Sequence, residues 1–250
     1  MFDAIGFDAD DTLWHNERLF SMTQEKFRGI LKEHAPDLVD RQLLDAEKKN
    51  LKIFGYGIKG FVLSMIETSI QLTKGGISGN EIEQIMDFGR EMLTAPIQLL
   101  EHVEDTLQQL QNNYILLLIT KGDLIDQETK IARSGLSDYF NSIEIISEKN
   151  VPAYQKILEK HQIQPERFLM VGNSIRSDIL PVLEMGGTAV YIPYEIDWAH
   201  EHDSKPSSST SFHEMKHLGK FPGWRKTMDV KTGGCVQDFL RCRFEGSKLI

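Results

Sequence analysis

Three short runs of apolar residues stand out along the chain, and a cluster of polar residues follows each of them directly. The runs are Ala4–Phe7, Tyr114–Ile119 and Phe168–Val171. Their apolar residues are continuous rather than alternating, which is typical of strands that are buried on both faces in a parallel sheet.

Weaker strand patterns and helical patterns complete this part of the chain. Two further strands are predicted at Ile143–Ile146 and Thr188–Ile192. Helices are predicted over Glu104–Gln111, Leu124–Ser134, Ala153–His161 and Ile175–Met185. The alternation of strand, polar turn and helix predicts an α/β fold with a doubly wound parallel sheet. Ligands of such sheets bind beyond the carboxyl ends of the strands, which is where the polar clusters lie.

The region between the first two runs carries no strand pattern. Amphipathic helices are predicted over Glu17–His34, Val39–Ile53, Ile58–Leu72 and Ile82–Leu93. Ser78 and Glu81 form a capping-box pattern ahead of the last of them. We therefore expect a helical domain over residues 14–101, inserted into an α/β core of residues 1–13 and 102–203.

The composition changes after residue 203. Residues 205–211 read Lys-Pro-Ser-Ser-Ser-Thr-Ser, which is typical of a linker. The segment from Arg225 to Ile250 is locally basic and shows no clear apolar pattern. Residues 204–250 are therefore predicted to be a linker and a C-terminal tail of unassigned role.

The overall charge balance is acidic. Lys and Arg number 28 against 37 Asp and Glu, so the net charge is −9 with neutral histidine. This balance argues against non-specific binding of nucleic acid, which needs a basic surface. No apolar stretch approaches the roughly 20 residues of a membrane span, and the first residues lack a secretory pattern. We expect no membrane partner and a cytoplasmic location, where the 2 cysteines stay reduced.

Asp8 and Asp10 follow the first predicted strand. Residues two apart point to the same side if the strand geometry continues, so the two carboxylates would repel each other unless a cation or a shared proton intervenes. One interpretation is a nucleophile and an acid/base group around a hard divalent cation. The other is turn chemistry or a helix N-cap, because aspartate suits both.

Residues suited to anions follow the second and third predicted strands. The hydroxyl of Thr120 and the amides of Lys121 and Gly122 would form an anion site where a helix begins. Simple N-capping is the alternative role of such a threonine. Lys149 would neutralise a phosphoryl group and hold the nucleophilic carboxylate, unless it is an ordinary surface lysine.

Asn173 and Asp178 follow the run at Phe168–Val171. They offer an amide oxygen and a carboxylate to the same edge of the sheet, and hard cations prefer oxygen ligands of this kind. The alternative is a capped turn that leads into the helix predicted from Ile175.

In this order, the four pieces resemble the motifs of the haloacid dehalogenase-like (HAD) hydrolase superfamily. The similarity covers about residues 1–200, including the helical insertion, which lies where that superfamily places its first-type cap. It implies a Rossmann-like core and, because Asp10 is present, the phosphatase-type branch. One departure is Asn173, where the family usually has an acid. An asparagine brings no charge, which implies weaker metal binding or a larger share for Asp178.

The resemblance also implies roles for these residues. Asp8 would be the nucleophile and Asp10 the acid/base group. Mg²⁺ would be held by an Asp8 oxygen, the Asp10 backbone carbonyl, and Asn173, Asp178 or both. The phosphoryl oxygens would be stabilised by Thr120, Lys121, Gly122 and Lys149.

The cap is expected to exclude water and to select the substrate. Its most loop-like stretch is residues 54–60, in which glycines flank Tyr56 and Lys59. Either side chain could touch the leaving group, and an ordinary turn between helices is the alternative.

The sequence therefore predicts a Mg²⁺-dependent phosphatase that acts on a small phosphorylated metabolite. Three alternatives remain: a sugar phosphomutase, a catalytically weak binding or regulatory protein, and a metal-independent 2-haloacid dehalogenase. The presence of Asp10 disfavours the dehalogenase. The sequence indicates neither the physiological substrate nor the oligomeric state.

Overall fold

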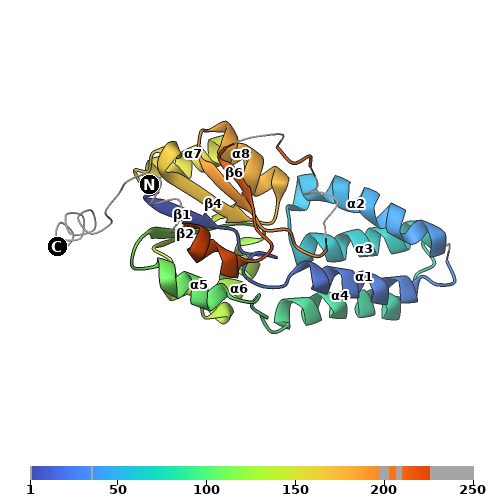
Figure 1. Cartoon of the computed structure of the whole chain (residues 1–250). Coiled ribbons are helices and arrows are strands. Elements are labelled where there is room, and N and C mark those ends of the chain that lie inside the picture. Colours follow the sequence, from blue (N-terminus) through green and yellow to red (C-terminus); the bar gives the residue numbers. More distant parts are fainter. Residues whose placement is uncertain (1, 35, 197–202, 207–209, 226–250) are drawn as a thin grey trace, which may run out of the picture.

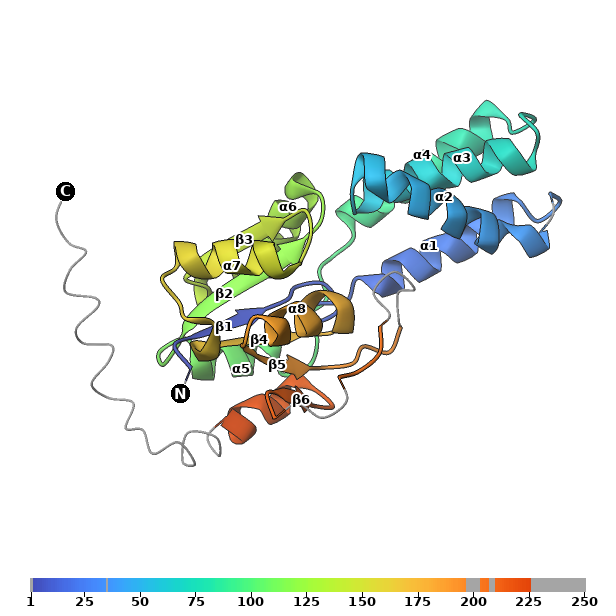
Figure 2. The same cartoon turned by 90° about the horizontal axis from the view of Figure 1, so that it is seen from above.

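The computed structural model describes residues 2–34, 36–196, 203–206 and 210–225. A six-stranded sheet forms the centre of the larger domain (Figures 1 and 2). Its strands are β1 (Ala4–Phe7), β2 (Ile115–Lys121), β3 (Ser142–Ile146), β4 (Phe168–Gly172), β5 (Thr188–Tyr191) and β6 (Phe212–Glu214). They lie in the order β3-β2-β1-β4-β5-β6, and each neighbouring pair is parallel. The predicted doubly wound parallel sheet is confirmed.

Side chains of the strands alternate between two apolar layers, because successive residues point to opposite faces. Four helices cover the faces: α5 (Val103–Leu110), α6 (Leu124–Ser134), α7 (Val151–Lys160) and α8 (Leu180–Glu184). Leu116 and Leu118 of β2 pack in the layer formed with α5 and α6. Leu117 and Ile119 pack in the layer formed with α7 and α8. Burial on both faces explains why β2 reads as a continuous apolar run.

The helix predicted over Ile175–Met185 is divided in the structure. Residues Ile175–Ile179 form a π-helical turn, and α8 follows it. Pro181 has no N–H, so it cannot donate to the carbonyl of Ser177 one turn earlier. The hydroxyl of Tyr154 donates to that carbonyl instead, at 3.1 Å. The proline therefore explains the break, which lies just after Asp178.

Strand β6 lies in the segment predicted to be a linker and tail. Phe212–Glu214 pairs with β5, and Met215, Leu218 and Phe221 are buried against the layer that contains α5. A strand of three residues is too short to show a sequence period. The part of this segment that the structure describes, up to residue 225, therefore adds to the core. The basic stretch predicted as a tail, from residue 226 onward, lies outside the described residues.

The inserted cap is a bundle of four helices, α1 (Glu17–Ile30), α2 (Val39–Phe54), α3 (Ile58–Leu72) and α4 (Gly79–Thr94). It has its own apolar core, which includes Phe27, Leu43, Met65 and Ile85. Figures 1 and 2 show this bundle beside the sheet as a separate body. No helix in the described ranges combines the length and apolar character needed to cross a membrane.

Two short segments connect the cap to the core, and they pair with each other. The His15 N–H donates to the Gln98 carbonyl at 3.0 Å, and the Leu100 N–H donates to the Leu13 carbonyl at 2.9 Å. These bonds lie close to the predicted domain boundaries at residues 14 and 101. We refer to residues 14–16 and 95–100 as the hinge.

Candidate active site

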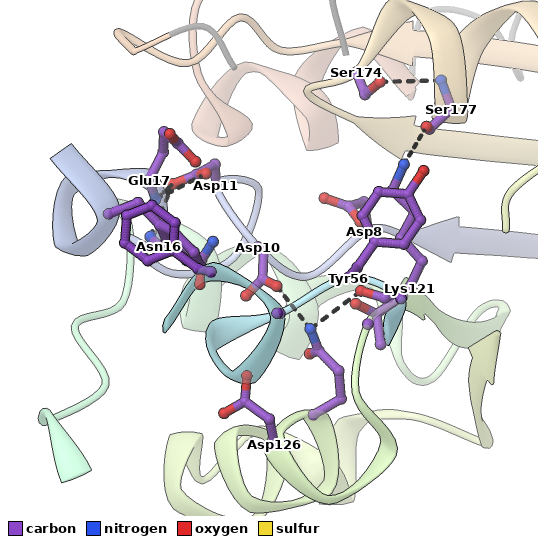
Figure 3. Close-up of a pocket in the computed structure, with 18 of the residues that line it drawn as sticks. Asp8, Asp10, Asp11, Asn16, Glu17, Tyr56, Lys121, Asp126, Ser174 and Ser177 are labelled. Carbon is purple, nitrogen blue, oxygen red and sulfur yellow. Dashed lines mark hydrogen bonds between the residues drawn. The ribbon is translucent and has the colours of Figure 1, made fainter. Parts of the chain in front are cut away.

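The polar residues after β1, β2, β3 and β4 meet at the carboxyl edge of the sheet, beneath the cap. A cavity at this edge is lined from both domains (Figure 3). Its core side includes Asp8, Asp10, Thr120, Lys121, Gly122, Lys149, Asn173 and Asp178. Its cap side includes Glu17, Phe20, Glu47, Leu51, Tyr56 and Phe61. The structure therefore brings together all but one of the predicted site residues, the exception being Lys59.

Asp8 continues β1, and its N–H donates to the Val171 carbonyl at 2.9 Å. Its carboxylate accepts from Lys149 Nζ at 2.5 Å on Oδ1 and from Thr12 Oγ1 at 2.9 Å on Oδ2. Burial raises the pKa of Asp8 to about 7 against the pull of the Lys149 ammonium, and the Asp178 carboxylate adds to the rise. This carboxylate is firmly oriented, and further positive charge beside it would keep it ionised.

Lys149 is buried between two carboxylates, with only 3% of the residue exposed. Its Nζ also donates to Asp178 Oδ1 at 2.7 Å, and the Ser174 N–H donates to Asp178 Oδ2 at 3.0 Å. A Cβ at Gly172 would lie 2.2 Å from that second oxygen, so only glycine fits there. Burial would lower the pKa of Lys149, but Asp178 and Asp8 outweigh it and raise the pKa. Lys149 is therefore a charged residue of the site and not a surface lysine.

Oxygen atoms converge beside Asp8 at the end of β4. Thr12 Oγ1 lies 3.2 Å from the amide oxygen of Asn173. With the amide turned over, its nitrogen would donate to Asp8 Oδ2 at 3.1 Å and to the Asp10 backbone carbonyl at 3.2 Å. The Asn173 amide thus faces two acceptors, Asp8 Oδ2 and the Asp10 carbonyl. The Asn173 oxygen would suit this position if a cation lay among these three oxygens.

This donor set fits a hard cation, because it combines carboxylate, amide and backbone oxygens. Within the described ranges, no cluster of three or more His, Cys, Asp or Glu side chains is arranged to hold a metal. Such a cation would therefore depend on Asn173 and on the Asp10 carbonyl. Asp178 Oδ1 accepts from Lys149 Nζ and Asp178 Oδ2 accepts from the Ser174 N–H, so Asp178 holds Lys149 in place in this structure.

Asp10 has a different environment from Asp8. Its carboxylate accepts from Trp14 Nε1 at 2.7 Å, from Gln127 Nε2 at 2.8 Å and from Lys130 Nζ at 2.7 and 2.8 Å. Burial would raise the pKa of Asp10, but the Lys130 ammonium and the hydrogen bonds from Lys130, Gln127 and Trp14 hold it below its usual range. The pKa values of Asp8 and Asp10 are therefore shifted in opposite directions, although the two residues lie two positions apart.

The residues after β2 lie in the cavity, but not as an N-cap. Strand β2 continues through Thr120 to Lys121, and Asp123 is the N-cap of α6, accepting from the Asp126 N–H at 3.0 Å. Thr120 is 1% exposed and lines the cavity. The N-capping alternative for Thr120 is therefore wrong, and the hydroxyl is left for the cavity.

Lys121 and Gly122 complete this corner of the site. Lys121 Nζ donates to Ser177 Oγ at 2.9 Å and lies 4.4 Å from the ring centre of Tyr56 (Figure 3). Gly122 has φ 151°, and a Cβ there would lie 2.7 Å from Gln127 Nε2. Glycine at this position therefore leaves room for the Gln127 side chain, which donates to Asp10.

Of the two cap residues predicted to touch a substrate, only Tyr56 lines the cavity. Its hydroxyl donates to Glu148 Oε2 of the core at 2.8 Å. Lys59 pairs with both oxygens of Asp123 at 3.0 Å and lies outside the cavity lining. Lys59 therefore holds the cap against the core in this structure.

Two carboxyl groups of the cap face the cavity, Glu17 from α1 and Glu47 from α2. Burial raises the pKa of Glu17 to about 8, and the neighbouring Asp11 and Glu47 add to the rise. Burial also raises the pKa of Glu47 to about 7. Asp11, which accepts from the Asn16 N–H at 2.8 Å, holds the chain where α1 begins.

The order of motifs and the geometry of this site agree with a comparison to known proteins. The chain matches the model of the haloacid dehalogenase-like hydrolases over residues 2–186. The chain belongs to this family. A haloacid dehalogenase-like family hydrolase from Xanthomonas campestris has a similar structure, with a TM-score of 0.84 and 38% identity, covering 93% of this chain and 94% of that chain.

Two relatives are named for an activity, glyceraldehyde 3-phosphate phosphatase. The one from Pyrococcus furiosus is 29% identical over 201 residues, which is 76% of this chain and 80% of the relative. The one from Methanothermobacter thermautotrophicus is 23% identical over 208 residues, which is 78% of this chain and 88% of the relative. Both relatives carry phosphatase names, and each match covers more than three quarters of this chain.

The sequence did not point to several residues of this site, chiefly Lys130, Gln127, Glu17 and Glu47. One signal was available for α6. Gln127 and Lys130 are three residues apart, so they share one face of the helix, which starts right after the polar cluster that follows β2. For Glu17 and Glu47 no such signal exists, because their place depends on how the cap lies over the core.

Proposed function

We propose that this protein is a phosphatase that hydrolyses a small phosphate monoester through an aspartyl-phosphate at Asp8, with Mg²⁺ as its cofactor. The observation that carries the proposal is the pairing of Asp8 with Lys149 at 2.5 Å at the head of a cavity that also holds Asp10. The family and the phosphatase names of the relatives support it.

In the first step, an Asp8 carboxylate oxygen attacks phosphorus and the bond from phosphorus to the ester oxygen breaks. The donors around Asp10 favour its ionised form, so Asp10 takes up a proton as the substrate binds and then gives it to the departing oxygen. In the second step, water attacks phosphorus, Asp10 takes the proton from that water, and the bond to Asp8 breaks. The products are an alcohol, inorganic phosphate and the original Asp8 carboxylate.

Positive charge is essential to this reaction, because a phosphate dianion must approach ionised carboxylates. At about 4 Å and an effective dielectric of about 20, each pair of like unit charges costs roughly 4 kcal/mol. Lys149 supplies one charge, and Thr120, Lys121 and the Gly122 amide offer donors to the phosphoryl oxygens. When bound, Mg²⁺ supplies the remaining charge, held by an Asp8 oxygen, the Asp10 carbonyl and the Asn173 amide oxygen.

The experiment is phosphate release from a panel of phosphate monoesters, 4-nitrophenyl phosphate included, with Mg²⁺ and after treatment with a chelator. We expect wild-type turnover only with the metal and a loss of at least about 10³-fold in Asp8→Asn. Asp45→Asn, an exposed position on α2, is the matched control and keeps full activity. Activity retained by Asp8→Asn would refute the proposal. An isomerised sugar phosphate in place of free phosphate would instead identify a phosphomutase.

A further inference from the structure

The carboxylate of Asp10 is held by four hydrogen bonds from three residues. Trp14 donates to Oδ1, Gln127 donates to Oδ2, and Lys130 donates to both oxygens. Two carboxylate oxygens held by four hydrogen bonds from three donor groups have a single favourable orientation. A residue that must meet both a leaving oxygen and a water molecule needs such a fixed position, because misplacement of a proton donor lowers the rate sharply.

Lys130 contributes most to this arrangement, since it contacts both oxygens and carries the opposing charge. It lies on α6 with 12% of its side chain exposed, against 21% for Asp10. An ion pair at this depth is screened less than one on the surface. Lys130 lies outside the four motifs identified in the sequence, and its partner Asp10 is distinct from those of Lys149, which pairs with Asp8 and Asp178. Each of the two reacting carboxylates therefore has an ammonium group of its own.

Lys130 also reaches the hinge of the cap. Its Nζ donates to the Asn16 Oδ1 atom at 3.2 Å, and Asn16 directly precedes α1. Trp14, another donor to Asp10, belongs to the same hinge segment and is fully buried. Figure 3 shows Asp10 and Asn16 on one side of the cavity, with Asp8 on the other. The position of Asp10 is thus tied to α6 on one side and to the start of the cap on the other.

We propose that Lys130 is a positioning residue of the reaction, which orients the Asp10 carboxyl group toward the leaving-group oxygen and links that orientation to the hinge through Asn16. This inference rests on the proposed phosphatase function and adds a residue to it. Gln127 supports the same orientation, and the absence of a side chain at Gly122 provides the room for it.

The test is the dependence of kcat/KM on the leaving group, measured with aryl phosphates of similar shape. 4-Nitrophenyl phosphate releases a stable phenolate that needs little help from an acid, whereas phenyl phosphate needs a proton on its leaving oxygen. We expect Lys130→Met to lower kcat/KM for phenyl phosphate at least about tenfold more than for 4-nitrophenyl phosphate. Lys130→Arg keeps the charge and is expected to recover most of the kcat/KM for phenyl phosphate that Lys130→Met loses.

Lys160→Met is the matched control, because Lys160 makes a similar two-oxygen pair with Glu144 away from the cavity, at 2.8 and 3.0 Å. The ratio of its kcat/KM values for the two esters is expected to match that of the wild type. If Lys130→Met does not fold, Gln127→Met takes its place, with a smaller change of the ratio in the same direction. An equal loss for both esters, no loss, or no rescue by Lys130→Arg would overturn the inference. A wild type without any phosphate release would overturn the proposed function itself.

Discussion

Asp8 and Asp10 show that burial alone does not decide how a carboxyl group behaves. Both lie at the same edge of the sheet, yet the pKa of Asp8 is raised to about 7 and that of Asp10 is lowered. Asp8 shares its lysine with Asp178, whereas Asp10 accepts from Lys130, Trp14 and Gln127. At Asp10 the donors outweigh the cost of burial, whereas at Asp8 burial outweighs them.

Asn173 is the residue that tests the metal site. An aspartate at this position would add a negative charge to the three converging oxygens, so Asn173→Asp is expected to bind Mg²⁺ about tenfold more tightly than the wild type. Calorimetric titration with Mg²⁺ alone measures this affinity without any need for turnover. Asn113→Asp, an exposed position after α5, is the control and leaves the affinity unchanged. Equal or weaker binding by a folded Asn173→Asp protein would show that this side chain does not ligate the metal.

Glu47 makes the stability of the protein depend on pH. Its folded-state pKa of about 7 lies above the ordinary value of 4.5, because burial penalises the charged form. A raised acid contributes stability that is complete below about pH 4.5 and is lost as the pH rises through 7. Glu47→Gln is therefore expected to raise the free energy of unfolding at pH 8 by about 1–2 kcal/mol, after allowance for solvent screening, and to change nothing at pH 4.5.

Urea unfolding of the chelated protein at both pH values measures this effect without a contribution from bound metal. Glu33→Gln, at an exposed position, is the control and should behave as the wild type at both pH values. If Glu47→Gln does not exceed the wild type in free energy of unfolding at pH 8, the raised pKa of Glu47 is contradicted.

At the scale of elements, strands β1 to β5 and the cap helices were predictable, whereas strand β6 and the break before α8 were not. The continuous apolar runs at β1, β2 and β4 carry the signal of a sheet covered on both faces, and the structure has that sheet. The interruption before α8 depends on the interplay of Pro181 and Tyr154, which are far apart in sequence. Strand β6 depends on its pairing with β5, a tertiary contact without any local pattern.

The residues of the site likewise divide into those that the sequence predicted and those that it did not. Asp8, Asp10, Thr120, Lys149 and Asn173 were predictable, because each follows a predicted strand and such strands end at one edge. For Lys130 the sequence indicated only that it shares a helix face with Gln127 near this edge, and not which carboxylate it would pair with. Sequence order thus indicates which residues reach the edge of the sheet, whereas their pairing depends on the helices that pack there.

Helix α4 begins with the capping box that the sequence predicted. The Ser78 hydroxyl accepts from the Glu81 N–H at 3.2 Å, and Glu81 accepts from the Ser78 N–H at 2.8 Å. Removing the hydroxyl leaves a donor of the first turn without a partner, so Ser78→Ala is expected to lower the free energy of unfolding by about 1 kcal/mol. Ser78→Thr keeps the hydroxyl and should lose much less in chemical denaturation. An equal loss in both variants would show that the hydroxyl does not cap the helix.

At the scale of the whole molecule, the cavity exists only because two domains meet. The cap contacts the core through Tyr56 and Glu148, through Lys59 and Asp123, and through Arg18 and Glu195, whose pair measures 2.6 Å. The last two pairs are largely exposed and contribute little stability each. Such contacts suit a cap that closes over a substrate and releases a product.

The chain has a net charge of −9, and several of its carboxylates lie together at the candidate site. Asp8, Asp10 and Asp178 gather two lysines, and the proposed cation at the oxygens around Asn173 would add further positive charge. With that cation, an acidic protein would hold a phosphate group at one edge of its sheet, because the local charge would be reversed.

In the proposed mechanism, Asp8 carries the phosphoryl group during turnover. The most direct measurement is acid quenching of the protein during turnover of 4-nitrophenyl phosphate with Mg²⁺, followed by digestion and mass spectrometry. Asp10→Asn, in which the second step is slow, serves to accumulate the intermediate. We predict one added phosphoryl group on the peptide that contains Asp8, and none in Asp8→Asn. A phosphoryl group on any other residue, or phosphate release with no phosphorylated peptide in Asp10→Asn, would contradict the account.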